Sequence, residues 1–236
     1  MLRHLLSSGD IRSYIVNLLL TLPIILLALS THETAHGIAA YKLGDPTAKS
    51  LGRLTLNPLK HLDPIGFICM VFFGYGWAKP VPINSRYFKK PRRDMAISAL
   101  AGPMSNLLLA AGFTVLLKLA SMLLFSITYP SQLMATMAGY VIIFLYYGIS
   151  LNVTLAVFNL IPIPPLDGSR IIAAFLPPKL AYAYVRYERI LSIILMVGLI
   201  LGLSSGIGII TDLVVKLYLT AGFMINTPVW SFLYGI

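Results

Sequence analysis

The pentapeptide His32-Glu33-Thr34-Ala35-His36 has the residue types and the spacing of a metal-dependent hydrolytic site. Residues four apart lie on one face of a helix, so the imidazoles of His32 and His36 can reach a single ion. Glu33 between them can act as general base on a water molecule. Five letters also recur by chance, and the alternative interpretation is two polar histidines at a helix end near a membrane interface.

The surroundings of the pentapeptide favour the metal. It lies in the C-terminal part of an otherwise apolar block, residues 14–41. Ionisable side chains are costly to keep in a membrane span without partners. A bound cation would give all three of them a partner, so we predict a metal site here.

A catalytic site with three protein ligands needs one more His, Asp or Glu. The chain has eight acidic residues and four histidines, and Asp167 stands out among them. It closes the string Asn159–Gly168 (NLIPIPPLDG), whose prolines interrupt a helix, and broken backbone in a membrane protein is tolerated best where it lines a site. The alternative role for Asp167 is a helix cap. His61 and Asp63 are rival ligands, but both lie in a polar loop where a solvated role or a loop hydrogen bond suffices.

The composition indicates a membrane protein. The 236 residues are 58% hydrophobic and 11% charged, with a mean hydropathy of +0.84, whereas a soluble domain is about 45–50% apolar and about 25% charged. We predict an all-α polytopic membrane protein with a single domain over residues 1–236. About five transmembrane helices are expected, at 14–41, 95–125, 137–160, 190–203 and 207–223.

Residues 65–83 differ from the other apolar blocks. Their apolar run, 65–78, is shorter than the ~20 residues that a spanning helix needs. Its glycines and the prolines that follow oppose a helix, while Val71, Phe72 and Tyr75 favour extended structure. We predict a short re-entrant extended or β element, buried against protein. Such a strand could pair with an unwound substrate by strand addition.

The net charge of +10 reflects loops rather than a nucleic-acid surface. Ten of the 18 Lys and Arg lie in residues 42–93 and four more in 170–189. The positive-inside rule produces such clusters, and no RNA- or DNA-binding motif accompanies them, so we expect no nucleic-acid partner. The same rule predicts that segments 42–94 and 164–189 are cytoplasmic and the N-terminus outside. The single cysteine, Cys69, excludes an internal disulfide.

Three motifs in this order resemble the site-2 protease family of intramembrane zinc metalloproteases: HETAH, the AGPMSN of residues 101–106, and NLIPIPPLDG. The stretch from about residue 57 to 106, which includes GWAKPVPIN, is similar to the compact prokaryotic branch without PDZ or CBS domains. The resemblance covers about residues 14–175. It implies one Zn²⁺ per chain, bound between the first and third spans by His32, His36 and Asp167.

The resemblance also implies an activity: hydrolysis of peptide bonds within or near transmembrane segments of membrane-protein substrates, by a zinc-activated water with Glu33 as base. Asn106 and Asn159 are candidates for binding the substrate or the oxyanion, and the alternative for each is hydrogen bonding between helices. The expected location is the prokaryotic cell membrane, multi-pass in the lipid bilayer, with the site towards the cytoplasmic side.

Two other functions fit parts of the sequence. The first is a polytopic ion or metal transporter, since intramembrane acids and histidines also form ion paths; against it, no span pairs with another as an inverted repeat. The second is a catalytically silent scaffold of the same fold, and the intact Glu33 argues against it.

Overall fold

The computed structural model shows a protein that is mostly helical over its described residues. Three helices among the described residues are long and apolar enough to cross a membrane: α2 (Ile11–Lys42), α5 (Pro91–Leu124) and α6 (Gln132–Leu160). These three candidate spans coincide with the first three predicted spans. The structure describes residues 10–73, 76–126, 128–200 and 205–220.

Local signals start each long helix. The carboxylate of Asp10 accepts a hydrogen bond from the backbone N–H of Ser13 and caps α2. The hydroxyl of Ser131 caps α6 in the same way, and α5 begins with Pro91, which needs no N–H bond in the first turn. Such caps satisfy backbone donors that a helix start leaves unpaired.

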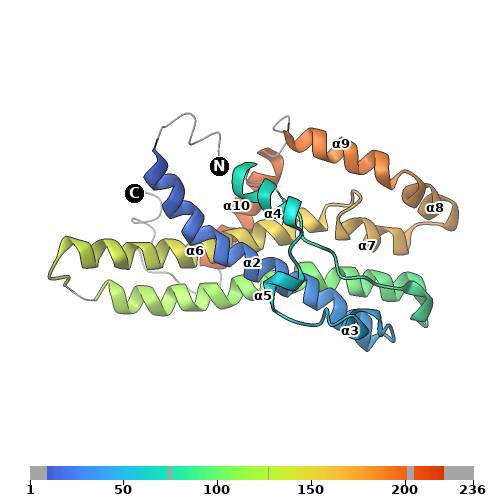
Figure 1. Ribbon diagram of the computed structural model, residues 1–236, viewed down its shortest axis with the longest axis horizontal. Coiled ribbons are helices and arrows are strands. Elements are labelled where there is room, and N and C mark those ends of the chain that lie inside the picture. Colours follow the sequence, from blue (N-terminus) through green and yellow to red (C-terminus); the bar gives the residue numbers. More distant parts are fainter. Residues whose placement is uncertain (1–9, 74–75, 127, 201–204, 221–236) are drawn as a thin grey trace.

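Helices α5 and α6 run antiparallel, and α2 crosses them and contacts both (Figure 1). The buried apolar core lies between α5, α6 and α10 (Ser205–Thr220). Large apolar side chains also cover the outside of the spans; Leu19 and Leu108 are 66% and 70% exposed. An outer surface of this kind suits lipid as the surrounding solvent. The core residues are Ala110, Phe113, Leu117, Ile142, Leu145, Ile149, Val153, Val215 and Leu219.

Shorter elements connect and flank the spans. After α2 come two short turns of helix, then α4, and a further turn before α5; after α6 come three helices before α10. Helix α7 follows the Pro-rich string and packs against α5. Their bounds are α3 Thr47–Ser50, η1 Pro58–Lys60, α4 Pro64–Phe73, η2 Ser85–Tyr87, α7 Asp167–Phe175, α8 Pro178–Arg186 and α9 Glu188–Ile200.

The predicted extended element is wrong over its first half, because Pro64–Phe73 forms helix α4. A local cap explains the difference: Asp63 accepts a hydrogen bond from Gly66 N at 2.8 Å and Pro64 occupies the first turn. These start signals outweigh the β-propensity of the aromatic and β-branched residues. The described residues contain no strand, only an isolated antiparallel bridge between Leu62 and Ala78.

The predicted fourth and fifth spans are not decided by the described residues. Helix α9 has 13 residues and α10 has 16 in their described parts. The predictions 190–203 and 207–223 both run into residues outside the described ranges. Five spans therefore stay a prediction, and the described residues contain three candidates.

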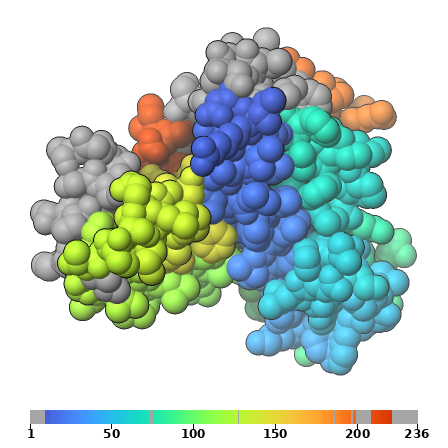
Figure 2. Space-filling view, turned by 60° about the vertical axis from the view of Figure 1, so that its left-hand side comes forward, coloured from blue at the N-terminus to red at the C-terminus, as the bar shows by residue number. Residues whose placement is uncertain are grey.

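The chain that follows α2 returns along that helix. In Figure 2, α2 (blue) lies between the yellow-green part of the chain and the cyan segment that follows α2 in the sequence. This return places residues 76–84 beside the half of α2 that carries the HExxH motif. A hydrogen bond from Val81 N to Glu33 joins the two segments.

Candidate metal centre

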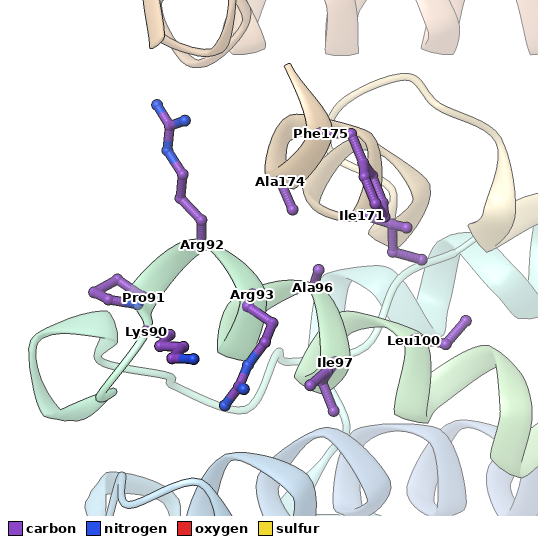
Figure 3. A pocket seen from close by; sticks show the side chains of 10 residues that line it. All are labelled: Lys90, Pro91, Arg92, Arg93, Ala96, Ile97, Leu100, Ile171, Ala174 and Phe175. Carbon is purple, nitrogen blue, oxygen red and sulfur yellow. The ribbon is translucent and has the colours of Figure 1, made fainter. Parts of the chain in front are cut away.

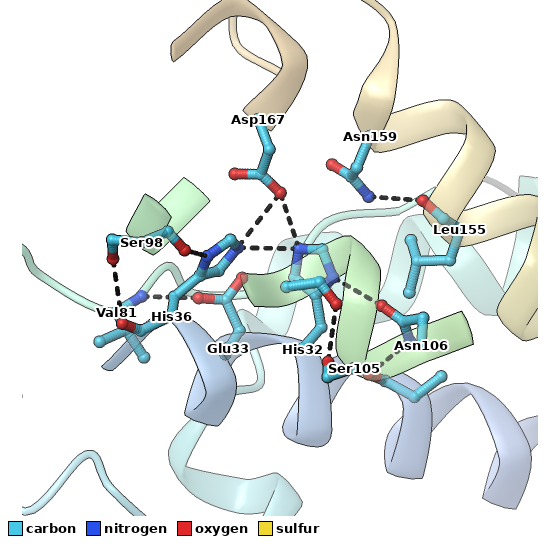
Figure 4. Close-up of polar contacts among 12 residues, drawn as sticks. His32, Glu33, His36, Val81, Ser98, Ser105, Asn106, Leu155, Asn159 and Asp167 are labelled. Atoms are coloured by element: carbon cyan, nitrogen blue, oxygen red, sulfur yellow. Dashed lines mark hydrogen bonds and ion pairs between the residues drawn. The ribbon is translucent and has the colours of Figure 1, made fainter. Parts of the chain in front are cut away.

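The structure brings the three predicted ligands together from two elements (Figure 4). His32 and His36 lie one turn apart on α2, and Asp167 is the first residue of α7. The Nε2 atoms of the two histidines are 3.0 Å apart, and each is 3.1 Å from Oδ2 of Asp167. All three residues are buried.

This triangle has nearly the size that a metal requires. Zinc binds nitrogen and carboxylate oxygen at about 2.0–2.2 Å, so donors at the corners of a tetrahedron lie about 3.3–3.5 Å apart. Three donors at 3.0 to 3.1 Å form one nearly equilateral face of such a tetrahedron. Its fourth corner points away from them and is the position that a catalytic site leaves for water.

The hydrogen bonds behind His32 fix its tautomer. Its Nδ1 lies 2.6 Å from Oδ1 of Asn106. The Nδ2 of that amide donates to Ala28 O and to Oδ1 of Asn152, so the atom facing His32 is the acceptor oxygen. His32 therefore carries its proton on Nδ1, and a neutral imidazole presents the Nε2 lone pair to the triangle.

His36 is fixed in the same way by backbone. Its Nδ1 lies 2.7 Å from the carbonyl oxygen of Ser98 on α5, which can only accept. The Nε2 of neutral His36 is again a lone pair. Two nitrogen lone pairs and a carboxylate oxygen thus converge with no hydrogen between them. A cation bound among them would offset the repulsion between these three electron-rich atoms.

Asp167 supplies the negative charge. Its Oδ2 is buried and makes no hydrogen bond. A buried, ionised oxygen of this kind is costly unless something binds it, and a metal ion fits the donor set. Among the described residues, these three side chains form the group able to share one ion.

The sequence around Asp167 explains its position. Helix α6 ends at Leu160, and the prolines that follow prevent it from continuing. Leu166 N bonds to Ile163 O, which turns the chain back, and α7 starts at Asp167. The broken backbone therefore aims the carboxylate at the two histidines of α2.

Gly102 lets α5 come close to the two imidazoles. A Cβ at this position would lie 2.4 Å from Nε2 of His36 and 2.7 Å from Cε1 of His32. Any larger residue would displace a ring, so the glycine of the AGPMSN element is part of the site. The sequence singles out the motif but not the function of this residue in it.

Glu33 lies beside the triangle on α2, half-buried, and one carboxylate oxygen, Oε2, accepts a hydrogen bond of 2.7 Å from the backbone N–H of Val81. Figure 4 shows its carboxylate between the His36 ring and Val81. The Glu33 carboxylate is not one of the three atoms that converge as metal ligands. This position suits a general base better than a ligand.

The two predicted asparagines lie in different places. Both N–H groups of the Asn106 amide and its oxygen are engaged by Ala28, Asn152 and His32. Asn159 lies next to Asp167 in Figure 4 and donates one of its two N–H groups to Leu155 O. The sequence prediction missed Asn152, which is fully buried; an amide inside an apolar span was the signal for it.

The rival ligands do not join the site. Asp63 caps α4 through Gly66. His61 Nε2 lies 2.7 Å from Thr55 O, so the predicted loop hydrogen bond is confirmed. At 1% exposure, however, His61 is buried and not solvated.

Two hollows lie near the centre. One, of about 960 Å³, lies between residues 80–85, the start of α5, α7 and α8, and reaches Val81 and Ser169. The other, of about 750 Å³, lies between the start of α5 and α7 and has an apolar floor that includes Ile97 and Phe175 (Figure 3). In Figure 3 the side chains of Arg92 and Arg93 point in different directions from it. Only the first hollow reaches the segment that contacts Glu33.

Comparison with known proteins agrees with this geometry. Residues 20–205 match the family model described as Peptidase family M50. The chain belongs to this peptidase family, which confirms the resemblance to site-2 proteases.

Two curated relatives illustrate the similarity. The chain is 42% identical over 182 residues to the Bacillus subtilis protein named "Putative zinc metalloprotease YwhC", covering 77% of this chain and 80% of that one. It is 30% identical over 175 residues to "Putative zinc metalloprotease Rip2" of Mycolicibacterium smegmatis, covering 71% of this chain and 61% of the relative. No solved structure matches the chain. The apolar helices and the family together indicate a membrane protein.

Proposed function

We propose that this protein is an intramembrane zinc metalloprotease that hydrolyses peptide bonds within or near transmembrane segments of membrane proteins. The observation that carries the proposal is the convergence of two Nε2 lone pairs and one carboxylate oxygen at 3.0 to 3.1 Å, with a second carboxylate, that of Glu33, beside them. The ligands would be His32, His36 and Asp167, with one Zn²⁺ per chain.

The chemistry divides between the ion and the side chains. Zinc bound to these three residues would supply an acidified water and a Lewis acid for the scissile carbonyl. Glu33 would take a proton from the attacking water and deliver it to the leaving amine. Asn159 is the proposed oxyanion or substrate donor, because its amide faces the site and has a second N–H. Asn106 is assigned to orienting His32, since both of its N–H groups are used elsewhere.

The position of the site along α2 supports an intramembrane substrate. His32 lies ten residues before the end of α2 at Lys42, about 15 Å along the axis at 1.5 Å per residue. Lys42 opens the basic loop that the positive-inside rule places in the cytoplasm. We therefore place the site inside the cell membrane, in the leaflet nearer the cytoplasm. The hollow of about 960 Å³ beside Val81 gives an unwound segment room to enter.

Glu33→Gln tests the proposal against a transporter or a silent scaffold. The purified protein, with and without a zinc chelator, is incubated with a panel of single-span membrane proteins. Wild type should cleave at least one of them, the chelator should stop cleavage, and Glu33→Gln should lower turnover by about 10² to 10⁴ while keeping zinc. Cleavage by Glu33→Gln at the wild-type rate would refute the mechanism. No cleavage by zinc-loaded wild type across the panel would favour the scaffold or the transporter.

A further inference from the structure

The segment from Ala78 to Asn84 is held at both ends by the loop that follows α2. Near its start, Lys79 N donates to His61 O at 2.8 Å. At its end, Asn84 N donates to Oδ2 of the buried Asp45 at 2.6 Å. The segment contains no helix, yet its path past the metal centre is fixed by these contacts.

In the middle of this segment, Val81 N donates to Glu33 Oε2 at 2.7 Å (Figure 4). The residues on either side, Pro80 and Pro82, have no backbone N–H. Val81 therefore carries the only backbone donor of this three-residue stretch, and that donor is bound to the carboxylate. A hydrogen bond to an ionised carboxylate is about twice as strong as a neutral one.

Arg53 holds the other side of the same peptide unit. Its Nη2 donates to Lys79 O at 2.7 Å and to Pro80 O at 3.3 Å. The carbonyl of Pro80 and the N–H of Val81 belong to one planar trans peptide, so they point in opposite directions. Arg53 on the oxygen and Glu33 on the N–H thus fix the orientation of that plane. Arg53 is buried, at 8% exposure, and its Nη2 bonds to these two carbonyls.

The side chain of Val81 is also fixed against α2. It is 7% exposed, and a Cβ built on Gly37 would lie 3.2 Å from its Cγ1 and 2.5 Å from Leu54 Cδ2. Gly37 directly follows His36, so the close approach occurs within the turn of α2 that carries the motif. Val81 is therefore held by its backbone and by its side chain.

We infer that the peptide unit between Pro80 and Val81 positions the Glu33 carboxylate, and that Arg53 is the side chain that orients this unit. The inference rests on the proposed function, in which Glu33 is the base. A free Glu side chain samples many rotamers, and general-base catalysis requires one of them. With Oε2 held by Val81, Oε1 is left for the proton of the attacking water.

This arrangement changes the role expected for the segment. The N–H and carbonyl of Lys79, the carbonyl of Pro80 and the N–H of Val81 are all bonded within the protein. Strand addition of a substrate would need such groups to be unpaired. These four backbone groups therefore hold the catalytic base and are not available to pair with the substrate backbone.

Hydrogen–deuterium exchange tests the contact without requiring activity. Because Pro80 and Pro82 have no amide hydrogen, deuterium uptake over residues 80–82 reports Val81 alone. In the zinc-loaded full-length protein in detergent, this amide should exchange slowly, and at least about tenfold faster in Glu33→Ala. Glu33→Gln keeps an acceptor oxygen and should retain much of the protection. Fast exchange of Val81 in wild type would overturn the inference.

Kinetics then test the positioning role of Arg53. Arg53→Gln should lower kcat by up to about 100-fold, with KM and zinc content close to wild type, because a misplaced base affects the chemical step. Arg53→Lys keeps a cationic donor for the two carbonyls and should recover part of kcat. Arg86→Gln is the control, since Arg86 is an exposed cation of the same loop region. Val81 exchange should be faster in Arg53→Gln and unchanged in Arg86→Gln.

The outcomes separate this inference from the proposed function. A raised KM with unchanged kcat in Arg53→Gln would make the segment a substrate contact and refute positioning. Unchanged Val81 exchange in Arg53→Gln would refute the role of Arg53 even if that variant lost activity through poor folding. If wild type cleaves nothing, the proposed function fails. If wild type cleaves its substrate while Val81 exchanges fast, this inference fails alone.

Discussion

Asn106 lies directly behind His32, with Oδ1 of the amide 2.6 Å from Nδ1 of the imidazole. The same amide donates to Ala28 O on α2 and to Asn152 on α6. One side chain of α5 therefore connects all three long helices at the depth of the metal centre. Hydrogen bonds between membrane helices contribute only about 0.6 kcal/mol on average. We conclude that Asn106 matters more for the orientation of His32 than for holding the helices together.

Asn106→Ala should lower zinc affinity by about 10- to 100-fold, because the partner that orients a metal-binding histidine has an effect of this size. Competition with a chelator of known affinity measures it. Thr114→Val is a matched control: Thr114 is also fully buried on α5, but its hydroxyl bonds within its own helix, to Ala110 O. Equal zinc affinity in the two variants would remove Asn106 from the metal centre.

Zinc content should distinguish the proposed ligands from their sequence rivals. Asp167→Ala and His36→Ala should each lose the proposed zinc, since either change leaves two of three donors. His61→Ala and Asp63→Ala should keep it, because those side chains bond to Thr55 and Gly66 instead. Elemental analysis of detergent-purified protein decides between them. Stoichiometric zinc in Asp167→Ala would exclude that residue as a ligand.

The orientation in the membrane can be tested by cysteine labelling. With Cys69→Ser as the unlabelled background, Lys49→Cys and Lys90→Cys should react with a membrane-impermeant maleimide only from the cytoplasmic side. Ser131→Cys should react only from outside, because α5, between positions 90 and 131, is long and apolar enough to cross the membrane. All three positions are exposed. The reverse pattern would move the metal centre to the opposite leaflet.

The candidate site could be predicted well from the sequence because its chemistry is carried by rare residues. Ionisable side chains in apolar spans are few, so the HExxH motif and Asp167 are distinctive by residue type and position alone. The three long helices followed from the length and composition of the apolar blocks. What these residues touch could not be predicted in the same way: the Asn106–Asn152 pair depends on how α5 and α6 pack.

Helix α4 shows where residue propensities fail. Val71 and Phe72 have high β-propensity, but the residue pair Asp63-Pro64 starts a helix, and the start signal decides the conformation of the whole segment. The contact between Val81 and Glu33 could not be predicted from the sequence for another reason. It is made by a backbone N–H, which every residue except proline has, so residue identity could not single it out.

Gly102→Ala should disrupt the metal centre, and Gly112→Ala should not. Both glycines lie in the interior of α5, so the change in helix propensity is the same and favours alanine by roughly 0.5–1 kcal/mol. Their surroundings differ. A Cβ at Gly112 meets nothing within 4 Å, whereas one at Gly102 would lie 2.4 Å from Nε2 of His36. Gly102→Ala must therefore separate α5 from α2 or rotate an imidazole, and overpacking of this kind costs about 1–3 kcal/mol.

Thermal unfolding and zinc content, measured on the same preparations, decide this prediction. Gly112→Ala should keep its zinc and unfold at or slightly above the wild-type Tm. Gly102→Ala should unfold at a lower Tm and bind zinc more weakly, because the displaced ring is a proposed ligand. Gly102→Ser would add a hydroxyl to the same crowding and should lose at least as much zinc. Wild-type zinc affinity and Tm in Gly102→Ala would show that α5 does not press on the two histidines, and the arrangement of the three ligands described above would be wrong.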